Sequence, residues 1–580
     1  MVECKHGTPV TDAGGPFVSS VVADVALVGL VLLYPFGDGR EELLNMAQNV
    51  NKLGVASVLA VAMCAGMAMG QTRTQGPDVI VGDLSDWATF TPYDPDGTGP
   101  QPLIHAYAIG TTSCNIGTAL LDWYTTGTAT TQNPANFHPV IGQNLYRYRP
   151  VTLRDSVTGV PISTTQVGQF EQIGQSWLKH GFTALAQNLC HNCVTIDNTG
   201  ATLDPGCSDP YSASLNGTQS RLGPRFQVNA FTGIFPFPVT GVPTVPSATT
   251  GGNIFRRLQV LRTDLDPSLN SGAIYFGEGQ YITQDDHPAE TNIGTVANPV
   301  WVKNAWNNVS WRRANYTFNA ATNSSGTFTW NGATQRMQSA LFAWKSVQPT
   351  VEIVNVDVPS APLPGTNVAA EGRFQIGYNV TDLGNGKWYY EYAVYNMFSD
   401  RSAGSFAINI AGDGSCVDVN NIGFKDVFYH SGEPYSGTDW ASSKSNSQVK
   451  WEVTESFAQN QNANALRWGT TYTFRFVSDR APVAGTATIG LFKPATALST
   501  AMSVDAAVMV PGGGNCGCDI DFNNNGVFPE DQDVVDFFDV LAGGACGSCD
   551  AIDFNRNSVF PEDQDVVDFF NVLAGGDCPY

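Results

Sequence analysis

Residues 373–394 read RFQIGYNVTDLGNGKWYYEYAV and predict a β-hairpin. Apolar side chains alternate with polar ones on both sides of an Asn385-Gly386 pair. A period of two puts alternate side chains on one face of a strand, and Asn-Gly favours the tight turns of hairpins. The stretch therefore predicts two antiparallel strands with one buried face. That face would carry Phe374, Ile376, Tyr378 and Val380, then Trp388, Tyr390, Tyr392 and Val394.

The chain on either side of this hairpin has the same character. Short alternating runs recur at 273–281, 471–476 and 485–492, separated by Gly, Pro, Asn and Thr. Of the 580 residues only 14% are charged, while 42% are hydrophobic, which suits an extracellular β-rich protein better than a cytosolic α/β enzyme. We expect a mainly β protein with two β-sandwich-like modules, the first containing disulfides. The expected modules are residues 71–345 and 346–510, followed by a Gly-rich linker at 511–515.

The last part of the chain, residues 516–580, contains one pattern twice. The sequence DFNNNGVFPEDQD occupies 521–533, and DFNRNSVFPEDQD occupies 553–565. Each copy is followed by an apolar stripe at i, i+3, i+4 and i+7 and then by two glycines, which is typical of a short helix and its end. Oxygen-bearing side chains at alternate loop positions, closed by a carboxylate near a helix start, are what Ca²⁺ takes in EF-hand loops. The pattern predicts two loop-helix units with one calcium ion each.

The expected ligands occupy the usual positions of such a loop. An EF-hand has its closing carboxylate at position 12, where this chain has Gln532. We interpret the loop as one residue longer, closed by Asp533 at the start of the helix, with Asp531 as a nearby alternative. Ser558 replaces the turning Gly526 in the second copy, so the second site is expected to be weaker. The ligands expected are Asp521, Asn523, Asn525, the carbonyl of Val527, Asp531 and Asp533, then Asp553, Asn555, Asn557, Val559, Asp563 and Asp565.

An acidic tail whose carboxylates are merely solvated is the alternative interpretation. Residues 516–580 carry 14 Asp and Glu against one Arg. Disordered acidic tails lack paired apolar stripes and cysteines, and this segment has both, so a folded module is favoured. We expect two disulfides that bracket the units, Cys518 with Cys546 and Cys549 with Cys578.

These repeats resemble type I dockerins, and more closely the GC-type dockerin domain-anchored proteins, which are secreted bacterial proteins that end in a doubled, cysteine-flanked repeat. The resemblance covers 516–580; the extra loop residue, the asparagines at positions 3 and 5 and the flanking cysteines depart from the type I pattern. It implies a small α-helical module that binds calcium and docks onto a cohesin-like or cell-surface protein. Residues 138–211 look like the recurrent N-terminal region of the same secreted proteins, which implies export but no chemistry.

Residues 46–70 predict a secretory signal peptide. A positive charge precedes an apolar run at 53–69, and small residues lie just before Gln71, where cleavage is expected. Residues 1–45 are interpreted as an upstream extension that an incorrectly chosen start codon adds. A membrane anchor around Val25–Tyr34 is the alternative, but that run is short for a bilayer. We expect a secreted protein, extracellular or at the cell surface, with no membrane span in its mature chain.

One cysteine- and histidine-rich region of the first module has two interpretations. In one, His138, His180 and His191 join a C-x-x-C pair, Cys190 and Cys193, in a zinc or copper site. In the other, Cys114, Cys190, Cys193 and Cys207 form two disulfides, and the histidines are core or surface residues. The second is favoured, because a single C-x-x-C pair is a weak zinc signal and an exported protein oxidises its thiols.

Composition and motifs exclude several classes of function. A net charge of −23 argues against binding to nucleic acid. The chain has no G-x-S-x-G, H-E-x-x-H, phosphate-loop or dinucleotide motif. We expect a non-catalytic binding or structural body, with carbohydrate as a candidate ligand at the loop before Trp440, although a core position for Trp440 is favoured. The alternative is a secreted glycoside hydrolase carrying the same C-terminal module, whose paired carboxylates only the fold would reveal.

Overall fold

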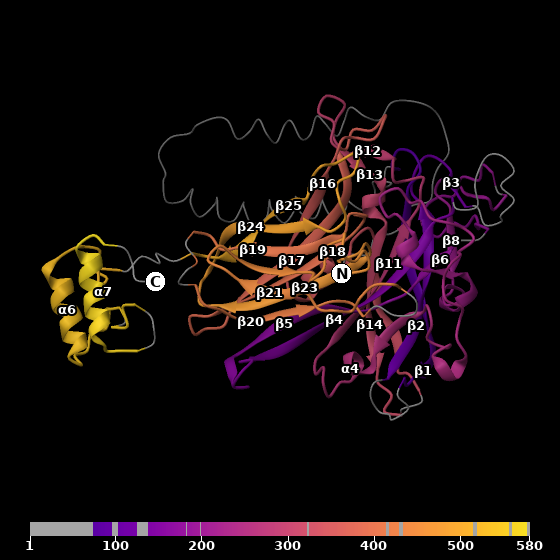
Figure 1. The fold of residues 1–580 in the computed structure, drawn as a ribbon. Helices are drawn as coiled ribbons and strands as arrows, with labels where there is room; N and C mark the ends of the chain where they lie inside the picture. Colours follow the sequence, from indigo (N-terminus) through magenta and orange to yellow (C-terminus); the bar gives the residue numbers. More distant parts are fainter. Residues whose placement is uncertain are drawn as a thin grey trace, which may run out of the picture. The chain divides into compact units, whose positions relative to one another are not determined.

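The computed structural model describes residues 73–95, 103–123, 137–180, 183–197, 199–321, 324–412, 414, 417–428, 433–513, 519–550, 552–555 and 559–576 (Figure 1). The expected extension at 1–45 and the signal peptide at 46–70 lie outside these residues. Strands predominate in the described part, so the mainly β class is confirmed. None of its helices is both long enough and apolar enough to cross a membrane.

The first half of the described chain builds one large antiparallel sheet. The strand order is β1 (Val79–Tyr93), β2 (Ile104–Asn115), β10 (Leu258–Leu261), β5 (Pro161–Gln175), β4 (Val140–Arg154), β11 (Ile274–Ile282), β14 (Val309–Thr317) and β15 (Thr327–Gln335). The short strands β6 (Leu178–His180), β8 (Ser208–Tyr211) and β9 (Leu222–Gly223) branch from it. Two further pairs are β3 (Leu121–Asp122) with β7 (Thr202–Leu203), and β12 (Glu290–Asn292) with β13 (Trp301–Lys303).

The two ends of this sheet meet. Leu84 N in β1 donates to Thr334 Oγ1 in β15 at 3.0 Å, and Ser310 Oγ in β14 donates to Val81 O at 2.7 Å. The expectation of a two-sheet sandwich here is therefore wrong: the sheet curls until its first strand lies against its last strands. Alternation of apolar and polar residues indicates that one face of a strand is buried. It does not tell whether a second sheet covers that face or the same sheet curls over it, because either arrangement buries it.

Strands β4 and β5 are buried on both faces over residues 140–147 and 167–175. Leu145 and Ile173 belong to the core inside the curled sheet, whereas their near neighbours Tyr146 and Phe170 belong to a second core on the outer face. That second core also contains Trp344 of helix α5 (Ala340–Val347). Segments later in the chain thus cover the outer face of the first module.

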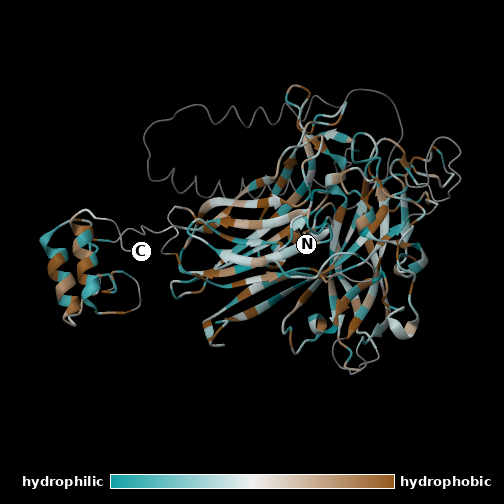
Figure 2. Cartoon of the chain, viewed as in Figure 1, coloured by the Kyte–Doolittle hydropathy of each residue, from teal (hydrophilic) through white to brown (hydrophobic). Residues whose placement is uncertain are grey.

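The second module is a sandwich of two five-stranded antiparallel sheets. One sheet has the order β16 (Glu352–Pro359), β17 (Ala370–Asp382), β18 (Trp388–Asn396), β23 (Thr470–Ser478) and β20 (Val419–Lys425). The other has the order β21 (Ala441–Lys444), β22 (Gln448–Glu452), β19 (Ala403–Asn409), β24 (Pro482–Leu491) and β25 (Ser503–Pro511). Hydrophobic and hydrophilic residues alternate along these strands in Figure 2, as a half-buried sheet requires.

The predicted hairpin is β17 and β18. Asp382 pairs with Trp388 across the turn, and Gly384 and Gly386 have φ values of +75° and +74°, which suit glycine. The alternating face is buried between the two sheets through Phe374, Ile376, Tyr390, Tyr392 and Val394. The predicted strands at 273–281, 471–476 and 485–492 correspond to β11, β23 and β24.

Buried contacts join the two β modules across the expected boundary at 345/346. Helix α5 spans that boundary, and Phe170 N in β5 donates to Glu391 Oε1 in β18 at 3.0 Å. Tyr146 Oη and Thr471 Oγ1 are 3.1 Å apart. At the other end of the sandwich, Gly512 N of the expected linker donates to Ala481 O at 3.0 Å, directly after β25.

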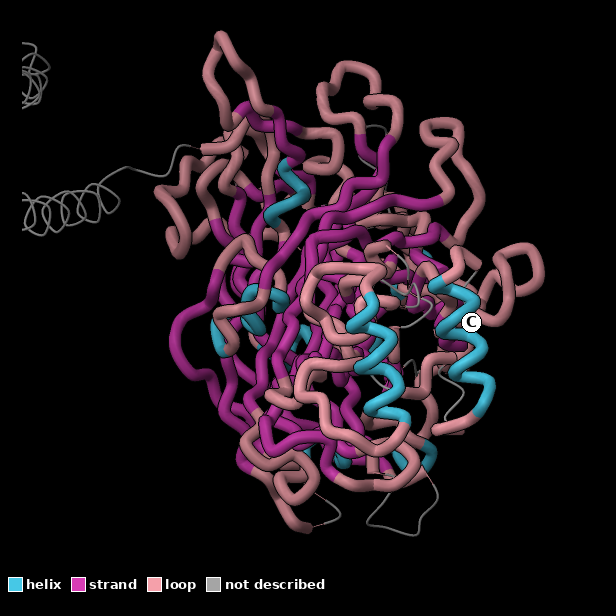
Figure 3. Tube along the Cα trace, turned by 90° about the vertical axis from the view of Figure 1, so that its left-hand side faces the viewer, coloured by secondary structure: helices cyan, strands magenta, loops and turns pink. Residues whose placement is uncertain are grey.

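The C-terminal repeat forms two helices, α6 (Asp531–Leu541) and α7 (Asp563–Leu573), shown in cyan in Figure 3. They pack through the stacked rings of Phe537 and Phe569, whose centroids are 4.2 Å apart. One phenylalanine from each preceding loop, Phe522 and Phe554, completes a small buried core. Each repeat thus contributes one loop ring and one helix ring.

Candidate calcium loops and the pocket beside His180

The first loop winds around the side chain of Asp521. This carboxylate is only 7% exposed, and its two oxygens accept the backbone N–H groups of Asn525 at 3.0 Å and Gly526 at 2.7 Å. Gly526 has φ +80°, which makes the sharp turn without strain. Asn525 Oδ1 in turn accepts the N–H of Val527 at 2.8 Å. The loop therefore holds Asp521 in a fixed orientation, as a first ligand position requires.

Helix α6 begins two residues earlier than expected. Glu530 occupies the N-cap position, and Asp533, expected to begin the helix, is its third residue. Glu530 N donates to Asp533 Oδ2 at 3.3 Å, so that Asp533 closes a capping box. Asn523 N donates to Asp533 Oδ1 at 3.4 Å, which places this fully buried carboxylate against the loop. Its oxygens each retain a lone pair beyond these bonds.

A carboxylate that the sequence pattern did not single out also contacts the loop. Asn523 Nδ2 donates to Asp536 Oδ2 at 2.8 Å, one helical turn after Asp533. The second repeat has the same contact from Asn555 Nδ2 to Asp568 Oδ2 at 3.1 Å. The spacing i, i+3 from Asp533 was the available signal, because residues so spaced share a helix face.

The remaining predicted ligands differ in their surroundings. Asp531 and Asp563 are exposed at the first helical position, and the side chains of Val527 and Val559 are also exposed. In the second loop Asp553 and Asn555 are half-buried and Asp565 is fully buried, whereas Asn557 and Ser558 lie outside the described residues. Within the described ranges, no three Asp, Glu, His or Cys side chains come together as a metal-binding group.

The pairing predicted for the C-terminal cysteines is wrong. Cys546 and Cys549 bond to each other across a Cα distance of 5.4 Å, in the connection between the two repeats. Closing so short a loop costs little chain entropy. The prediction instead paired each of these cysteines with a more distant one, Cys518 or Cys578. Those two cysteines lie outside the described residues.

The two disulfides predicted in the first module are confirmed. Cys114 bonds to Cys190, and Cys193 bonds to Cys207. The C-x-x-C pair is thus split between two disulfides. Both thiols are consumed, which contradicts the alternative of a zinc or copper site built on them.

Two of the three candidate histidines lie together. His138 Nε2 and His180 Nδ1 are 3.0 Å apart and share a hydrogen bond inside the fold. Burial, together with the charge of His138, lowers the pKa of His180 to about 3. His180 is therefore neutral at physiological pH. His191 lies apart from it, half-buried beside the Cys114–Cys190 disulfide.

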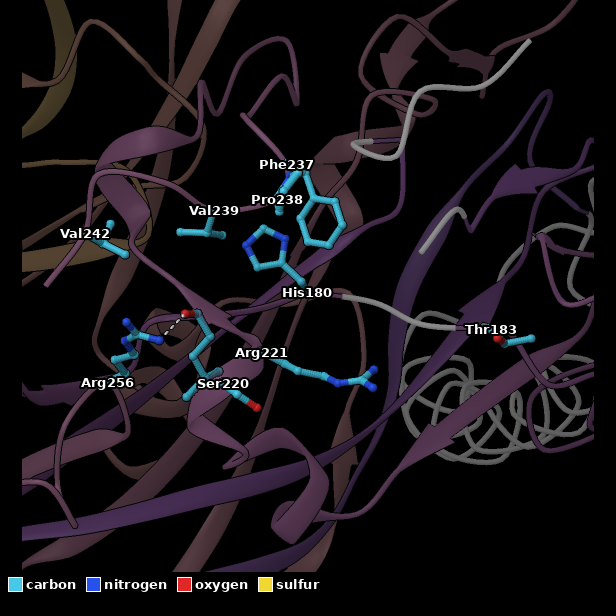
Figure 4. Close-up of a pocket in the computed structure, with 10 residues that line it drawn as sticks. His180, Thr183, Ser220, Arg221, Phe237, Pro238, Val239, Val242 and Arg256 are labelled. Carbon is cyan, nitrogen blue, oxygen red and sulfur yellow. Dashed lines mark hydrogen bonds between the residues drawn. The ribbon is translucent and has the colours of Figure 1, made fainter. Parts of the chain in front are cut away.

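His180 borders a pocket of about 490 Å³ (Figure 4). Arg256 fixes one wall, because its guanidinium lies 4.6 Å from the ring centroid of Trp177 and donates to Gln219 O at 2.9 Å. The lining mixes apolar and basic groups and contains no carboxylate, so this pocket lacks the acid pair of a glycoside hydrolase. Its residues are His180, Thr183, Ser220, Arg221, Leu222, Phe237, Pro238, Val239, Val242 and Arg256.

Trp440 lies in the core of the sandwich, as favoured from the sequence. Its side chain is 4% exposed, its ring stacks on Phe424, and its Nε1 donates to Asn464 O. The alternative of an exposed aromatic platform for carbohydrate at Trp440 is therefore wrong.

Comparisons with known proteins assign no family to this chain. No family model matches it, and no curated protein matches it. Among solved structures it is similar to the Serine-rich Repeat Adhesion Glycoprotein (Srr1) from Streptococcus agalactiae, at 8% identity over 76% of this chain and 97% of that chain. The TM-score of 0.16 is too low to indicate a common fold or a common function.

Proposed function

We propose that this is a secreted modular protein whose β-rich body is a non-catalytic binding or structural part, displayed through a C-terminal calcium module of the dockerin type. The carrying observation is the duplicated loop in which Asp521 accepts two backbone N–H groups directly before a capped helix. An oxygen-rich loop of this form suits a hard cation, and millimolar calcium is available outside cells.

The residues present fit such an ion. Asp521, Asn523 and Asn525 supply oxygens at alternate positions, and Asp533 and Asp536 supply carboxylates from the first turns of α6. On binding, the Asn523 amide would flip about its Cβ–Cγ bond, so that Oδ1 takes the position of Nδ2 beside Asp536 and faces the ion. The flip needs little space, because the amide oxygen and nitrogen are nearly equal in size. When bound, calcium would neutralise the carboxylates gathered at the loop. Asp531 is replaced by Asp536 in this proposal, because Asp531 is exposed.

Exposed apolar side chains support a docking role for the same module. Phe528 and Phe560 are each 61% exposed, and Val535 and Val567 are nearly as exposed on the two helices. Large apolar groups exposed in equivalent places on both repeats are typical of a protein-binding surface. A cohesin-like or cell-surface protein is the proposed partner.

Calorimetry of the full chain tests the calcium proposal. Wild-type protein should bind calcium with heats that Asp521→Ala removes for the first site and Asp521→Ala with Asp553→Ala removes for both C-terminal sites. Asp531→Ala is the matched control and should titrate like the wild type. Equal heats for wild type and the Asp521→Ala/Asp553→Ala variant would contradict the proposal.

A further inference from the structure

Two buried aspartates lie together at the start of the curled sheet, far in sequence from the C-terminal loops. Asp78 directly precedes β1, and Asp286 follows β11; both are 0% exposed. Val79 N donates to Asp286 Oδ2 at 3.4 Å, which brings the second carboxylate against the backbone next to the first. The negative charge of Asp78 is among the causes that raise the pKa of Asp286, after burial itself.

Two asparagines from a third segment join this pair. Asn307 Nδ2 donates to Asp78 Oδ2 at 3.1 Å, and Asn308 Nδ2 donates to Asp286 Oδ2 at 2.8 Å. Each carboxylate thus has one oxygen in a hydrogen bond with a neighbouring amide. The second carboxylate oxygen of each aspartate and the single amide oxygen of each asparagine, Oδ1 in all four, are buried and accept no hydrogen bond of normal geometry from any described residue.

Four buried oxygens that accept no hydrogen bond destabilise the folded state. Two buried carboxylates without a cation destabilise it further when they are ionised. A buried acceptor left unpaired destabilises the fold, and buried charges are normally paired or bound to metal. Lys303, on the same connection as Asn307, is engaged by Glu290 at 3.5 Å. Asp285 adds further negative charge beside Asp286. The Thr74 hydroxyl lies near enough to Asp78 to lower its pKa, but it makes no hydrogen bond of normal geometry. Among the described residues, no Lys or Arg forms an ion pair with either aspartate, so these oxygens lack a matching positive charge.

We propose that Asp78, Asp286, Asn307 and Asn308 form a body cation site that takes one hard divalent cation of the calcium type. Two carboxylates match its charge, and carboxylate and amide oxygens are its preferred ligands. The ion joins three segments that are distant in sequence: the entry to β1, the turn after β11 and the residues that lead into β14. Its role is therefore to fix the edge at which the curled sheet closes.

The test separates this site from the C-terminal loops. The reference protein is the full chain with Asp521→Ala and Asp553→Ala, which disables those loops, and the test protein adds Asp78→Asn and Asp286→Asn. All 12 tryptophans precede residue 469, so tryptophan fluorescence follows the unfolding of the body alone. The probe is Ca²⁺ alone, compared with a chelator at neutral pH.

Calcium at about 100 times its dissociation constant should raise the melting temperature of the reference protein by about 3 °C. The Asp78→Asn/Asp286→Asn protein should show no such rise. Terbium should give tryptophan-sensitised emission in the reference protein, because Trp306 adjoins Asn307, and calcium should quench that emission. This measurement needs no further variant, so it decides the matter even where the asparagine protein folds poorly.

Three results would overturn the proposal. One is a reference protein whose melting temperature ignores calcium and which gives no sensitised terbium emission. Another is a calcium shift that survives in the Asp78→Asn/Asp286→Asn protein. The third is a calcium-independent loss of stability as the pH rises from about 4 toward 7, which carboxyls held by protons would produce, since the pKa of Asp78 is raised by burial from 3.8 to about 7.

Discussion

Arg475 in β23 of the sandwich pairs with Glu171 in β5 of the curled sheet at 2.8 Å, and both side chains are largely buried. Glu171 also binds Arg147 of its own sheet at 2.5 Å. Burial alone would raise the pKa of Glu171, but Arg475 and Arg147 outweigh it and lower the pKa. An ionised group shared by the two modules therefore lies at their interface.

Removing this charge should destabilise the body strongly. Glu171→Gln removes the carboxylate shared by the two guanidinium groups and leaves Arg147 with Asp264 at 3.0 Å and Arg475 with Glu391 at 3.7 Å. Because these partners compensate part of the charge, we expect the free energy of unfolding to fall by about 3 kcal/mol, the lower end of the range for breaking a buried pair. Denaturant unfolding followed by tryptophan fluorescence measures it. Lys345→Met removes the more exposed pair with Glu352 at 3.1 Å and should cost less than about 1 kcal/mol. A comparable loss in both variants would contradict this view of the interface.

Acid should destabilise the fold through His180. Its folded pKa is lowered from 6.5 to about 3, so its contribution to stability is complete above pH 6.5 and is lost as the pH falls below that value. Between pH 6.5 and 4 the wild type should lose about 3 kcal/mol more than His180→Asn. Denaturant midpoints measured across this range give the difference. The control is His191→Asn, at a less buried histidine, which should lose as much stability between pH 6.5 and 4 as the wild type. If His180→Asn also loses as much as the wild type, the prediction is wrong.

The two kinds of disulfide should differ in their effects. Cys114 and Cys190 are 76 residues apart, so Cys114→Ser with Cys190→Ser should cost about 4 kcal/mol of unfolding free energy on the chain-entropy estimate. Cys546 and Cys549 are three apart, and the same change there should cost about 2 kcal/mol. Denaturant unfolding measures the first, and calorimetric melting of the C-terminal module within the full chain measures the second. Equal costs would show that closing a long loop is not the source of the stability.

Asp536 should matter for calcium although it lies outside the loop motif. Asp536→Ala removes the carboxylate that Asn523 contacts at 2.8 Å, and we expect affinity at the first C-terminal site to fall about tenfold or more. Asp539→Ala removes an exposed acid three residues along the same helix and is the control. Calorimetric titration of the full chain with calcium compares the two variants, and equal affinities would argue against a role for Asp536.

The local sequence pattern was sufficient to predict the hairpin of β17 and β18 and the apolar stripe of helix α6. The alternation around Asn385-Gly386 predicted β17 and β18 because a strand's period of two and a tight turn are properties of adjacent residues. The repeat at 521–544 predicted the apolar stripe of α6, but not that Glu530 would cap it and place Asp533 in its first turn. The i, i+3 spacing places Asp536 on the same helix face as Asp533, but only the contact with Asn523 showed that Asp536 reaches the loop.

The sequence by itself determined the β class, the strands at 273–281, 373–394, 471–476 and 485–492, and four cysteines of the body that oxidise, because these depend on side-chain periodicity and on composition. Only the tertiary structure decided that the first sheet curls until β1 meets β15 and that Cys114 selects Cys190. It also decided that Asp78 and Asp286 lie near each other in the interior. These outcomes depend on segments brought together from as far as 250 positions apart, and local sequence carries no information on which distant surface will cover a residue.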